Sequence, residues 1–532
     1  MAEHPEPLRS TQYLLGIDFG TESCRAAVFT ADGVQVAFWA TSYPTSYPRP
    51  GWAEQHPDDW RTALVESTRK AMALAEVRAD DIAGIGYAAT SHTLVTLDPS
   101  FRPLRPAIMW MDVRAATQSM RAGTDRVGAA ARVRSANVPA SAEMLPFKAA
   151  WLRENEPEVY RRAAVLLDAP DWVGHLLTGV LRTNQNSAAI KMYYDEGAGG
   201  FPVEFFADVG CGDVLEKLPN RVQSLGSPLG RLATSIAREL GLRPGTPVAE
   251  GCIDAYAGQI GLNVLTPGSM ALITGSSHAL IGQASVAVAR SGLVGAYPDA
   301  VIQGEATVEA ALVSSGSALR WFRDTFAVDE VRTAQATGRS AYDLLNQASQ
   351  HIRAGSDGLI VVPHFQGMRN PVADSNARAV ISGLSLHHTK AHLYHALQEG
   401  ICYGIAHNLQ HLEAHGVAVS KLVACGGALR SREWMQMHAD VTGLSIVLPK
   451  VRDAVSLGTC AMAATVAGIY PSVTQAAAAM FHEEEVLEPN PALHEQYAFY
   501  IEQHAETYPR LRDLQARYEA TKAPPIPTRG VD

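Results

Sequence analysis

The chain has 532 residues and 47% of them are hydrophobic, which is enough for two large domains with buried cores. Its formal net charge is −10 and no run of Lys and Arg could follow a nucleic acid backbone, which argues against binding of DNA or RNA. The first dozen residues lack the apolar core of a secretory signal, and no window approaches the ~18 apolar residues of a membrane span, so we expect a cytoplasmic protein with no membrane partner.

Residues 14–29 predict a β-hairpin, because an apolar run and an alternating strand flank a short polar turn. The turn combines a flexible glycine, Gly20, with the hydroxyls of Thr21 and Ser23 and the carboxylate of Asp18. Bent runs of backbone amides form anion-binding nests, and a nearby carboxylate can hold a divalent cation through water. The turn therefore indicates a phosphate and magnesium site, although such a turn taken alone more often has no ligand.

Strands then alternate with helices, which predicts an α/β fold with a mixed sheet. A helix is expected over residues 60–74, capped by Asp58 or Asp59. A buried strand over residues 82–90 leads to Ser91 and His92.

Two further segments place polar side chains beside apolar strands. The run at residues 103–116 brings Trp110, Asp112 and Arg114 to a loop edge, after which a helix begins. The loop at residues 142–151 enters a helix with Lys148 in its first turn, where the ordinary interpretation is a solvated surface lysine.

An apolar strand ends at Cys252, and a helix of small residues starts near Asp254. The simplest role for Asp254 is to cap this helix. The functional alternative is a general base, because the ends of strands in α/β sheets collect ligands. Residues 265–269 are then the expected domain boundary.

Residues 269–283 repeat the hairpin pattern, with Thr274, Gly275, Ser276 and Ser277 between two apolar strands. Two such hairpins about half a chain apart indicate duplicated domains, which could bring both turns to one phosphate chain. Farther along, Glu309 is expected to lead into a helix.

A long helix is expected over residues 390–416. It carries His392, His395, His407 and His411, but no Cys or carboxylate set stands at ligand spacing, so we predict surface or core histidines rather than a metal site.

A double glycine, Gly426-Gly427, lies between a strand and a helix ended by Gly443. It allows the backbone to approach a flat ring or a phosphate closely, or it is simply a tight turn. The end of the chain is expected to be helical over residues 486–520, with a disordered Pro-rich tail after it. No C-x-x-C spacing occurs, so free thiols are predicted at Cys24, Cys211, Cys252, Cys402, Cys425 and Cys460.

Six segments, in this order, resemble the FGGY family of carbohydrate kinases: GIDFGTESCRAAVF, PRPGWAEQHPDDW, PAIMWMDVRA, EGCIDAYAGQIG, the region of ISGLSLHHTKAHLYHALQEGICYG, and CGGALRSREWMQMHADVTG. The resemblance covers about residues 12–480 and implies an α/β fold of two actin-like ATPase / ribonuclease H-like domains flanking a catalytic cleft. The implied parts are an N-terminal domain over residues 12–264, a nucleotide-binding C-terminal domain over 265–485, and a helix and tail over 486–532.

The resemblance also implies a reaction and roles for single residues. The γ-phosphoryl of ATP would pass to a hydroxyl of a small sugar, with Asp254 as catalytic base and with Mg²⁺ held through water by Asp18 and Asp254; a homodimer is a guess at family level. The implied ATP-binding residues are Asp18, Gly20, Thr21, Ser23, Arg25, Thr274, Gly275, Ser276, Gly426, Gly427, Ala428 and Ser431. The implied sugar-binding residues are Ser91, His92, Trp110, Asp112, Lys148 and Glu309.

The tract GTES, with WMDVRA and the EMLPFK loop, resembles the ribulokinase-like branch, which favours a ketopentose, ribulose first. Two departures leave the substrate open: TGSSH stands where a Gly-Thr-Ser or Gly-Thr-Gly turn is more usual, and TSHTL replaces the Ser-Gln-Met type of segment of xylulokinases. Xylulose, erythritol or another polyol are alternatives, as is a non-catalytic actin/chaperone-like nucleotide-binding protein, because a fold alone does not fix a function.

Overall fold

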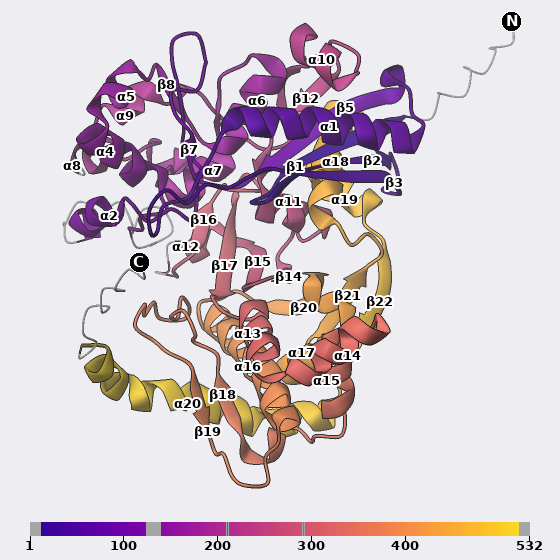
Figure 1. Ribbon diagram of the computed structural model, residues 1–532. Helices are drawn as coiled ribbons and strands as arrows, with labels where there is room; N and C mark the ends of the chain where they lie inside the picture. Colours follow the sequence, from indigo (N-terminus) through magenta and orange to yellow (C-terminus); the bar gives the residue numbers. More distant parts are fainter. Residues whose placement is uncertain are drawn as a thin grey trace, which may run out of the picture. The chain divides into compact units, whose positions relative to one another are not determined.

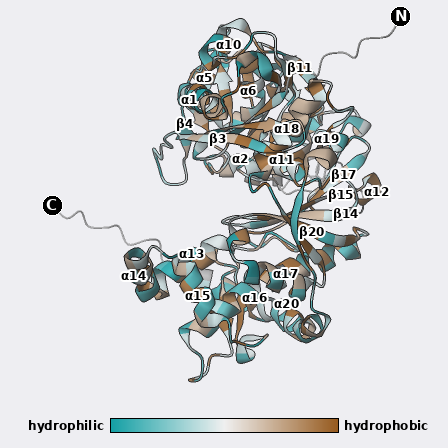
Figure 2. Ribbon diagram, turned by 90° about the vertical axis from the view of Figure 1, so that its right-hand side faces the viewer, coloured by the Kyte–Doolittle hydropathy of each residue, from teal (hydrophilic) through white to brown (hydrophobic). Residues whose placement is uncertain are grey.

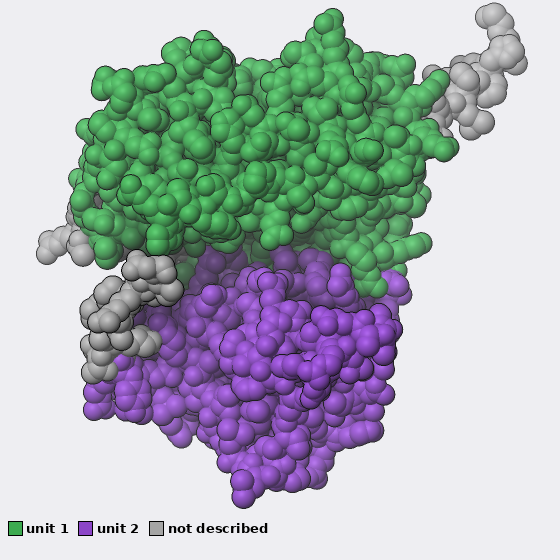
Figure 3. All heavy atoms as spheres, in the orientation of Figure 1, with its two compact units in different colours: residues 1–268, 281–308, 449–483 green, residues 269–280, 309–448, 484–532 purple. Residues whose placement is uncertain are grey.

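The computed structural model describes residues 12–123, 140–208, 210, 212–289, 291 and 293–520. The fold is mixed α/β, as the sequence predicted. Contacts divide the chain into two compact units, coloured separately in Figure 3. Unit 1 comprises residues 1–268, 281–308 and 449–483, and unit 2 comprises residues 269–280, 309–448 and 484–532.

A seven-stranded mixed sheet carries the core of unit 1, with strand order β11-β12-β5-β1-β2-β3 and with β13 also paired to β5 (Figure 1). Its strands are β1 (Tyr13–Phe19), β2 (Ser23–Thr30), β3 (Gln35–Ser42), β5 (Ile82–Ala89), β11 (Pro228–Arg231), β12 (Pro247–Ala249) and β13 (Cys252–Ile253). Strands β1 and β2 pair antiparallel, so the predicted hairpin is confirmed. Strand β5 runs parallel to β1.

Alternation along β1 decides which helix covers each face of this sheet. Leu15 and Ile17 are fully buried in a cluster that includes Leu64 of α1 (Pro57–Ala75). Gly16 faces α18 (Ala454–Val466), where a Cβ on this glycine would lie 2.4 Å from Thr459 Oγ1. Glycine therefore lets α18 approach the sheet closely. In Figure 2 the hydrophobic colour gathers in these strands and on α18.

The other elements of unit 1 are short. Its remaining helices are α2 (Ala116–Gly123), α4 (Leu145–Asn155), α5 (Pro157–Arg162), α6 (Ala169–Thr178), α7 (Gln185–Lys191), α8 (Val203–Asp208), α9 (Val214–Lys217), α10 (Thr234–Leu240), α11 (Asp254–Gly261), α12 (Val286–Ala289) and α19 (Val473–Met480), with 3₁₀ turns η1 (Ala79–Asp81) and η2 (Glu196–Ala198). Two-stranded sheets pair β4 (Glu54–Gln55) with β7 (Ala107–Ile108), β6 (Val95–Leu97) with β8 (Val165–Leu167), and β9 (Thr183–Asn184) with β10 (Val222–Gln223).

A second seven-stranded sheet has the order β16-β17-β15-β14-β20-β21-β22. Its strands are β14 (Gly268–Thr274), β15 (His278–Ser285), β16 (Ala296–Pro298), β17 (Glu305–Leu312), β20 (Val419–Gly426), β21 (Ser445–Pro449) and β22 (Glu483–Leu487). The helices of unit 2 are α13 (Gly316–Phe326), α14 (Val328–Thr337), α15 (Ala341–Ser349), α16 (Lys390–Ala414), α17 (Arg432–Thr442) and α20 (Pro491–Ala520), with η3 (Ser356–Gly358), η4 (Gly427–Arg430) and the pair β18 (Ile360–Val362) and β19 (Val380–Ser382). Helix α16 is buried along most of its length and packs against α17 and α20 (Figure 1).

The structure differs from the sequence-based expectations at three positions. The cap of α1 is His56, whose ring accepts a hydrogen bond from the backbone N–H of Asp58, rather than Asp58 or Asp59. Asp254 is the first residue of α11, which follows Ile253, and does not cap the helix. Glu309 lies inside β17, because its segment alternates between buried and partly exposed residues, as a strand does.

Five of the cysteines are free and buried, and Cys211 lies outside the described residues, as does the Pro-rich tail. None of the helices that the structure describes combines the length and the apolar character that crossing a bilayer requires. The compact units are also not continuous in sequence: residues 281–308 and 449–483 fold with unit 1, whereas the resemblance implied one C-terminal domain over 265–485.

Candidate active site

The turn between β1 and β2 holds an ion pair between a buried carboxylate and a partly exposed guanidinium. Asp18 and Arg25 are direct partners in the strand register, and Arg25 donates a hydrogen bond of 2.8 Å to Asp18 Oδ2. The turn is closed by a hydrogen bond of 3.0 Å from the N–H of Gly20 to the carbonyl oxygen of Ser23. The hairpin register thus places a carboxylate and a guanidinium beside the exposed backbone of a tight turn.

Two more carboxylates of unit 1 act on this pair. Asp254 begins α11, and Asp453 caps α18 by accepting hydrogen bonds from Ser456. Burial raises the pKa of Asp18 to about 8; the Arg25 guanidinium opposes this shift and the charges of Asp254 and Asp453 reinforce it. Burial also raises the pKa of Asp254 to about 6, against the Ala255 N–H and nearby Arg25 and Lys191.

Sequence reasoning did not single out Asp453. Its only local mark is an ordinary helix cap, because Asp453 precedes a helix and binds the N–H of Ser456. The fold makes it part of the site, since α18 packs against both α11 and the sheet. Sequence reasoning also missed Lys191, the last residue of α7, because only the fold brings it near Asp254.

The carboxylates fit a magnesium ion. Asp18 Oδ1 is buried without a hydrogen-bond partner, so the side chain has an oxygen left for a ligand. Mg²⁺ prefers oxygen donors and keeps several waters, which suits one or two carboxylates at the edge of a site. Asp18 and Asp254 would hold such an ion, and it would neutralise charge on a phosphoryl group there.

Neighbouring side chains fix the backbone of the same turn. The indole N–H of Trp110 donates a hydrogen bond of 3.1 Å to Thr21 Oγ1, and Gln55 Nε2 donates one of 2.7 Å to the Thr21 carbonyl oxygen. The hydroxyl of Tyr43 donates to the carbonyl oxygen of Gly20. Trp110, predicted on the sugar side, and Thr21, predicted on the phosphate side, are therefore in contact.

Lys148 differs from both sequence-based interpretations. It lies in the first turn of α4 as expected, but its side chain is fully buried rather than solvated. Its ammonium group donates hydrogen bonds to the carbonyl oxygens of His92 at 2.6 Å and Met109 at 2.7 Å, with Trp110 at 3.4 Å. Lys148 thus joins the loop after β5 to the loop that carries Trp110, instead of offering its donors to a sugar hydroxyl.

Asp112 is likewise occupied within the protein. It is fully buried and accepts hydrogen bonds from the N–H of Ala53 at 2.6 Å and from the Arg114 guanidinium at 2.8 and 2.9 Å. Arg114 also pairs with Glu54 at 2.8 Å and lies 3.8 Å from the ring centre of Trp52. Asp112 therefore orders the Trp110 loop, and a direct bond to a sugar hydroxyl has no support in its contacts.

The loop after β5 holds the other two sugar-side candidates of unit 1. Ser91 is partly exposed. His92 is fully buried, has the unusual φ of 54°, and neither ring nitrogen has a hydrogen-bond partner. Burial lowers the pKa of His92 well below its usual range, with Lys191 and Lys148 contributing, so this imidazole is neutral.

In unit 2 the second hairpin turn is tied to the double-glycine turn. Thr274 Oγ1 donates a hydrogen bond of 2.6 Å to the carbonyl oxygen of Cys425 and accepts one of 3.1 Å from the N–H of Ala428. Gly426 has φ of 98°, and a Cβ there would lie 2.1 Å from the carbonyl oxygen of Thr274. Only glycine allows this approach without strain.

These two turns border a cavity of about 600 Å³ that lies within unit 2. Six of the predicted residues line it: Thr274, Gly275, Ser276, Gly427, Ala428 and Ser431. Gly426 does not line the cavity but packs against Thr274, which does. Glu309 does not line it either and pairs with Arg369 at 3.1 Å. Sequence reasoning missed the cationic, aromatic and amide side chains of the wall, which include Arg320, Arg323, Arg430, Tyr342, Asn346, Tyr394, Gln398 and Trp434.

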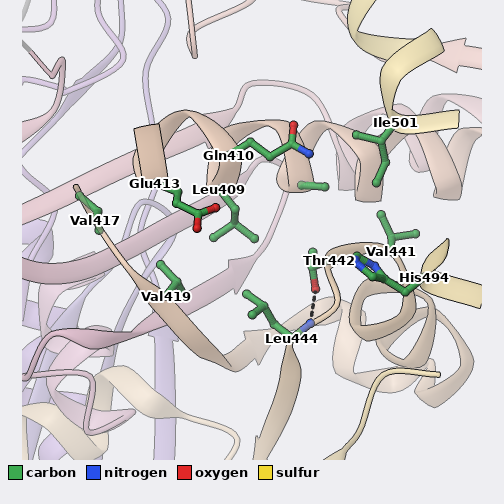
Figure 4. A pocket seen from close by; sticks show the side chains of 11 residues that line it. Leu409, Gln410, Glu413, Val417, Val419, Val441, Thr442, Leu444, His494 and Ile501 are labelled. Carbon is green, nitrogen blue, oxygen red and sulfur yellow. Dashed lines mark hydrogen bonds between the residues drawn. The ribbon is translucent and has the colours of Figure 1, made fainter. Parts of the chain in front are cut away.

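A smaller cavity of about 110 Å³ lies elsewhere in unit 2 (Figure 4). Its wall is part apolar and part polar: Leu409, Val419, Leu444 and Ile501 point toward it, and Gln410, Glu413, Thr442 and His494 also line it. None of the predicted site residues lines this cavity, so it is a packing gap between α16, α17 and α20 rather than part of the site.

Buried carboxylates beside a hairpin turn in one unit, and a roomy cavity with arginines and aromatic rings in the other, suit phosphoryl transfer to a small molecule. Each set of features is of a kind that small-molecule kinases use, and the comparison with known families identifies the class. Residues 13–261 match the N-terminal domain, and residues 270–467 the C-terminal domain, of the FGGY family of carbohydrate kinases. The chain belongs to the FGGY family of carbohydrate kinases and is an enzyme, which removes the non-catalytic alternative.

Relatives cover almost the whole chain. A protein of Xenopus laevis called FGGY carbohydrate kinase domain-containing protein is 31% identical, over 96% of this chain and 98% of its own length. A ribulokinase of Shouchella clausii is 29% identical over 96% of both chains, and a xylulose kinase of Bacillus subtilis is 27% identical over 94% of this chain and 98% of its own. The fold is similar to that of a xylulose kinase from Lactobacillus acidophilus, with a TM-score of 0.83 at 23% identity, over 95% of this chain and 100% of that chain.

Proposed function

We propose that this enzyme transfers the γ-phosphoryl group of ATP to a hydroxyl of a ketopentose, ribulose first, with Asp254 as the general base and Mg²⁺ at Asp18 and Asp254. The observation that carries the proposal is the group of carboxylates around Arg25, in which Asp18 Oδ1 is left without a partner. The cavity of about 600 Å³ in unit 2 is the proposed ATP site, and a homodimer stays a prediction.

The chemistry asks little of the protein beyond alignment and charge neutralisation. Asp254 accepts the proton of the attacking sugar hydroxyl, a new P–O bond forms, and the bond to the β-phosphate oxygen breaks to release ADP. A carboxylate whose pKa is raised to about 6 is still ionised at neutral pH and is a stronger base than an ordinary aspartate. Arg25 and the turn amides would bind phosphate oxygens.

Trp110 offers an apolar ring face to the sugar. It is only partly buried, and its indole N–H is already bonded to Thr21. Ser91 and Lys191 are partly exposed polar side chains of this region. Lys191 pairs with Glu143 at 3.3 Å and is close enough to Asp254 to lower its pKa. Ser91 and Lys191 are our candidates for contact with hydroxyl groups, with Lys148 and Asp112 holding the loops in place.

Ketopentoses are the proposed substrate class because relatives over the full length are called ribulokinase and xylulose kinase. Xylulose is the second candidate, supported by the Bacillus subtilis relative, which covers the chain almost completely. The two sugars differ only in the configuration at one carbon, so a single misplaced hydrogen bond can separate them.

A coupled assay of ADP release over C3 to C7 ketoses, aldoses and polyols tests the proposal. We expect the highest kcat/KM with ribulose, and Asp254→Asn should lower kcat by about 10²–10⁴-fold because the base is lost. Asp58→Asn is the matched control, since the side chain of Asp58 is 73% exposed in unit 1. If another sugar gives a higher kcat/KM than ribulose, that sugar replaces ribulose as the proposed substrate. If the Asp254→Asn variant keeps the wild-type kcat, Asp254 is not the general base.

A further inference from the structure

A group of metal-ligand side chains lies on the surface of unit 2. Asp357 comes from η3, while His387 and His392 come from the loop before α16 and from its first turn. Their ligand atoms all lie within 4.8 Å of one another. Among the described residues, this is the one group of three or more His, Cys, Asp or Glu side chains close enough to share a metal ion. None of the three lines the cavity of about 600 Å³.

The distances fit a tetrahedral zinc site. Asp357 Oδ2 is 3.5 Å from His387 Nε2 and 3.4 Å from His392 Nε2. Zinc binds histidine nitrogen and carboxylate oxygen at about 2.0–2.2 Å, so two ligands at tetrahedral angles are about 3.3–3.6 Å apart. The two edges that meet at Asp357 already have this length, without any movement of the side chains.

Neighbouring groups hold Asp357 in place. Its turn is anchored to α16, because Glu399 accepts hydrogen bonds from the N–H of Gly355 at 2.8 Å and from the Ser356 hydroxyl at 2.7 Å. Arg353 donates to Asp357 Oδ1 at 3.1 Å, which leaves Oδ2 facing the histidines. A carboxylate oriented in this way by outer partners is typical of metal ligands.

The histidines are also oriented. His392 Nδ1 accepts a hydrogen bond of 3.2 Å from the N–H of Thr389 and lies 2.9 Å from the Thr389 hydroxyl, which turns Nε2 toward Asp357. Zinc binding at Nε2 requires the ring proton to move to Nδ1, where the Thr389 hydroxyl oxygen would accept it in place of the bond from the N–H. His388, whose ring centre is 5.5 Å from that of His392, stands next to the group and bonds to the Asp357 carbonyl oxygen at 3.3 Å. The imidazoles and the carboxylate thus converge on one point at the surface.

We propose that Asp357, His387 and His392 form a binding site for one Zn²⁺ ion, with solvent in the fourth position. Two imidazoles with one carboxylate suit zinc better than magnesium or calcium, which prefer oxygen ligands alone. The proposal departs from the sequence-based expectation that His392 is an ordinary surface or core histidine. The carboxylate was missed because Asp357 comes from a separate loop and only the fold brings it to the histidines.

Equilibrium dialysis of the full chain against ZnCl₂, without nucleotide, tests the site, with zinc counted by elemental analysis and affinity measured by competition with a fluorescent zinc indicator. We expect one ion in the wild type, and at least tenfold weaker binding in His387→Ala and in Asp357→Asn. The His387 side chain is 71% exposed, so its removal should leave the fold intact. Cobalt(II) gives a second readout, because a tetrahedral ion absorbs visible light and should lose that band in both variants.

The matched control is His351→Ala, because His351 is an exposed histidine of unit 2 outside the group. It should bind zinc as the wild type does, and the magnesium-dependent kinase activity should be the same in all variants. The proposal is overturned if His387→Ala and Asp357→Asn bind zinc as tightly as the wild type. It is also overturned if His351→Ala weakens binding equally, since the ions would then be held at scattered surface histidines.

Discussion

At the residue scale, burial changes what a carboxyl group can do. Asp18 and Asp254 lie near one guanidinium but in a poorly solvated place, and the pKa values of both are raised. Loss of hydration destabilises the ionised carboxylates more than the single Arg25 guanidinium stabilises them. Because the two carboxylates also interact with each other, they titrate as a pair. A divalent cation at this place would stabilise both ionised forms.

The raised pKa of Asp254 predicts an acid limb in the pH profile. The ionised form accepts the proton and is lost as the pH falls through the pKa of Asp254, which is about 6 without a metal ion and lower where Mg²⁺ is bound. We expect kcat/KM to fall about tenfold per pH unit below that value. Rates measured at saturating magnesium-ATP over about pH 5 to 8, with circular dichroism to confirm folding, check this expectation. A flat profile in folded protein would exclude Asp254 as the titrating base.

Lys148 predicts a stability effect. Burial lowers its pKa to about 7, yet its ammonium group serves the carbonyl oxygens of His92 and Met109. Lys148→Met keeps the hydrocarbon stem but leaves buried carbonyl groups unpaired, so we expect a loss of about 3 kcal/mol in the free energy of unfolding. Lys421→Met, at an exposed position of β20, should be neutral. Equal urea midpoints for the two variants would show that Lys148 does not hold these loops.

At the scale of elements, the turn between β14 and β15 is a junction of three segments. Thr274 joins β14 to the end of β20 and to η4. The carbonyl oxygen of Ser276 accepts hydrogen bonds from the N–H groups of Ser315 at 3.1 Å and Ser317 at 3.0 Å, at the start of α13. The walls of the cavity are therefore ordered by backbone contacts that no single segment shows in its sequence.

Thr274→Val tests this junction. Valine has nearly the same shape but cannot donate to the Cys425 carbonyl oxygen or accept from the Ala428 N–H. We expect a loss of about 2 kcal/mol in stability and a KM for ATP raised about tenfold, because both turns that border the cavity loosen. Thr337→Val is the control, since Thr337 lies on exposed α14 and bonds only within that helix. An unchanged KM for ATP would show that the hydrogen bonds of Thr274 do not contribute to nucleotide binding.

The elements with a strong local pattern could be predicted from sequence. The hairpin of β1 and β2, helix α16 and the strand before Gly426 all show the expected periodicity, and the glycine-rich turns mark their ends. What could not be predicted is which side chains meet. Asp453, Tyr394 and Trp434 look like a helix cap and core aromatics in the sequence, and become site residues only through contacts between distant segments.

At the scale of the whole molecule, the chain returns to unit 1 at residues 449–483, after residues 309–448 of unit 2. Residues 449–483 bring α18 against α11 and the first sheet, which places Asp453 near Asp18. The return needs small residues: a Cβ on Gly458 would lie 1.8 Å from the Ala257 carbonyl oxygen, and one on Gly261 would lie 1.9 Å from that of Ala454. The glycines set the distance between the two helices.

Gly458→Ala should therefore force α11 and α18 apart. Because α11 begins with Asp254 and α18 follows Asp453, the shift moves two carboxylates of the site as well as costing about 3 kcal/mol of stability by overpacking. We expect a lower unfolding midpoint together with a kcat reduced at least tenfold at saturating ATP and sugar.

Gly258→Ala provides the contrast within the same pair of helices. A Cβ there would meet only Val455 Cγ2, at an ordinary 3.6 Å, and alanine favours the helix by up to about 1 kcal/mol. Its stability and kcat should match or exceed those of the wild type. If instead both variants behaved alike, the spacing of α11 and α18 would not control the carboxylates. Any effect of residues 449–483 on kcat would then need another cause, because these residues are connected to Asp254 through the packing of α18 against α11.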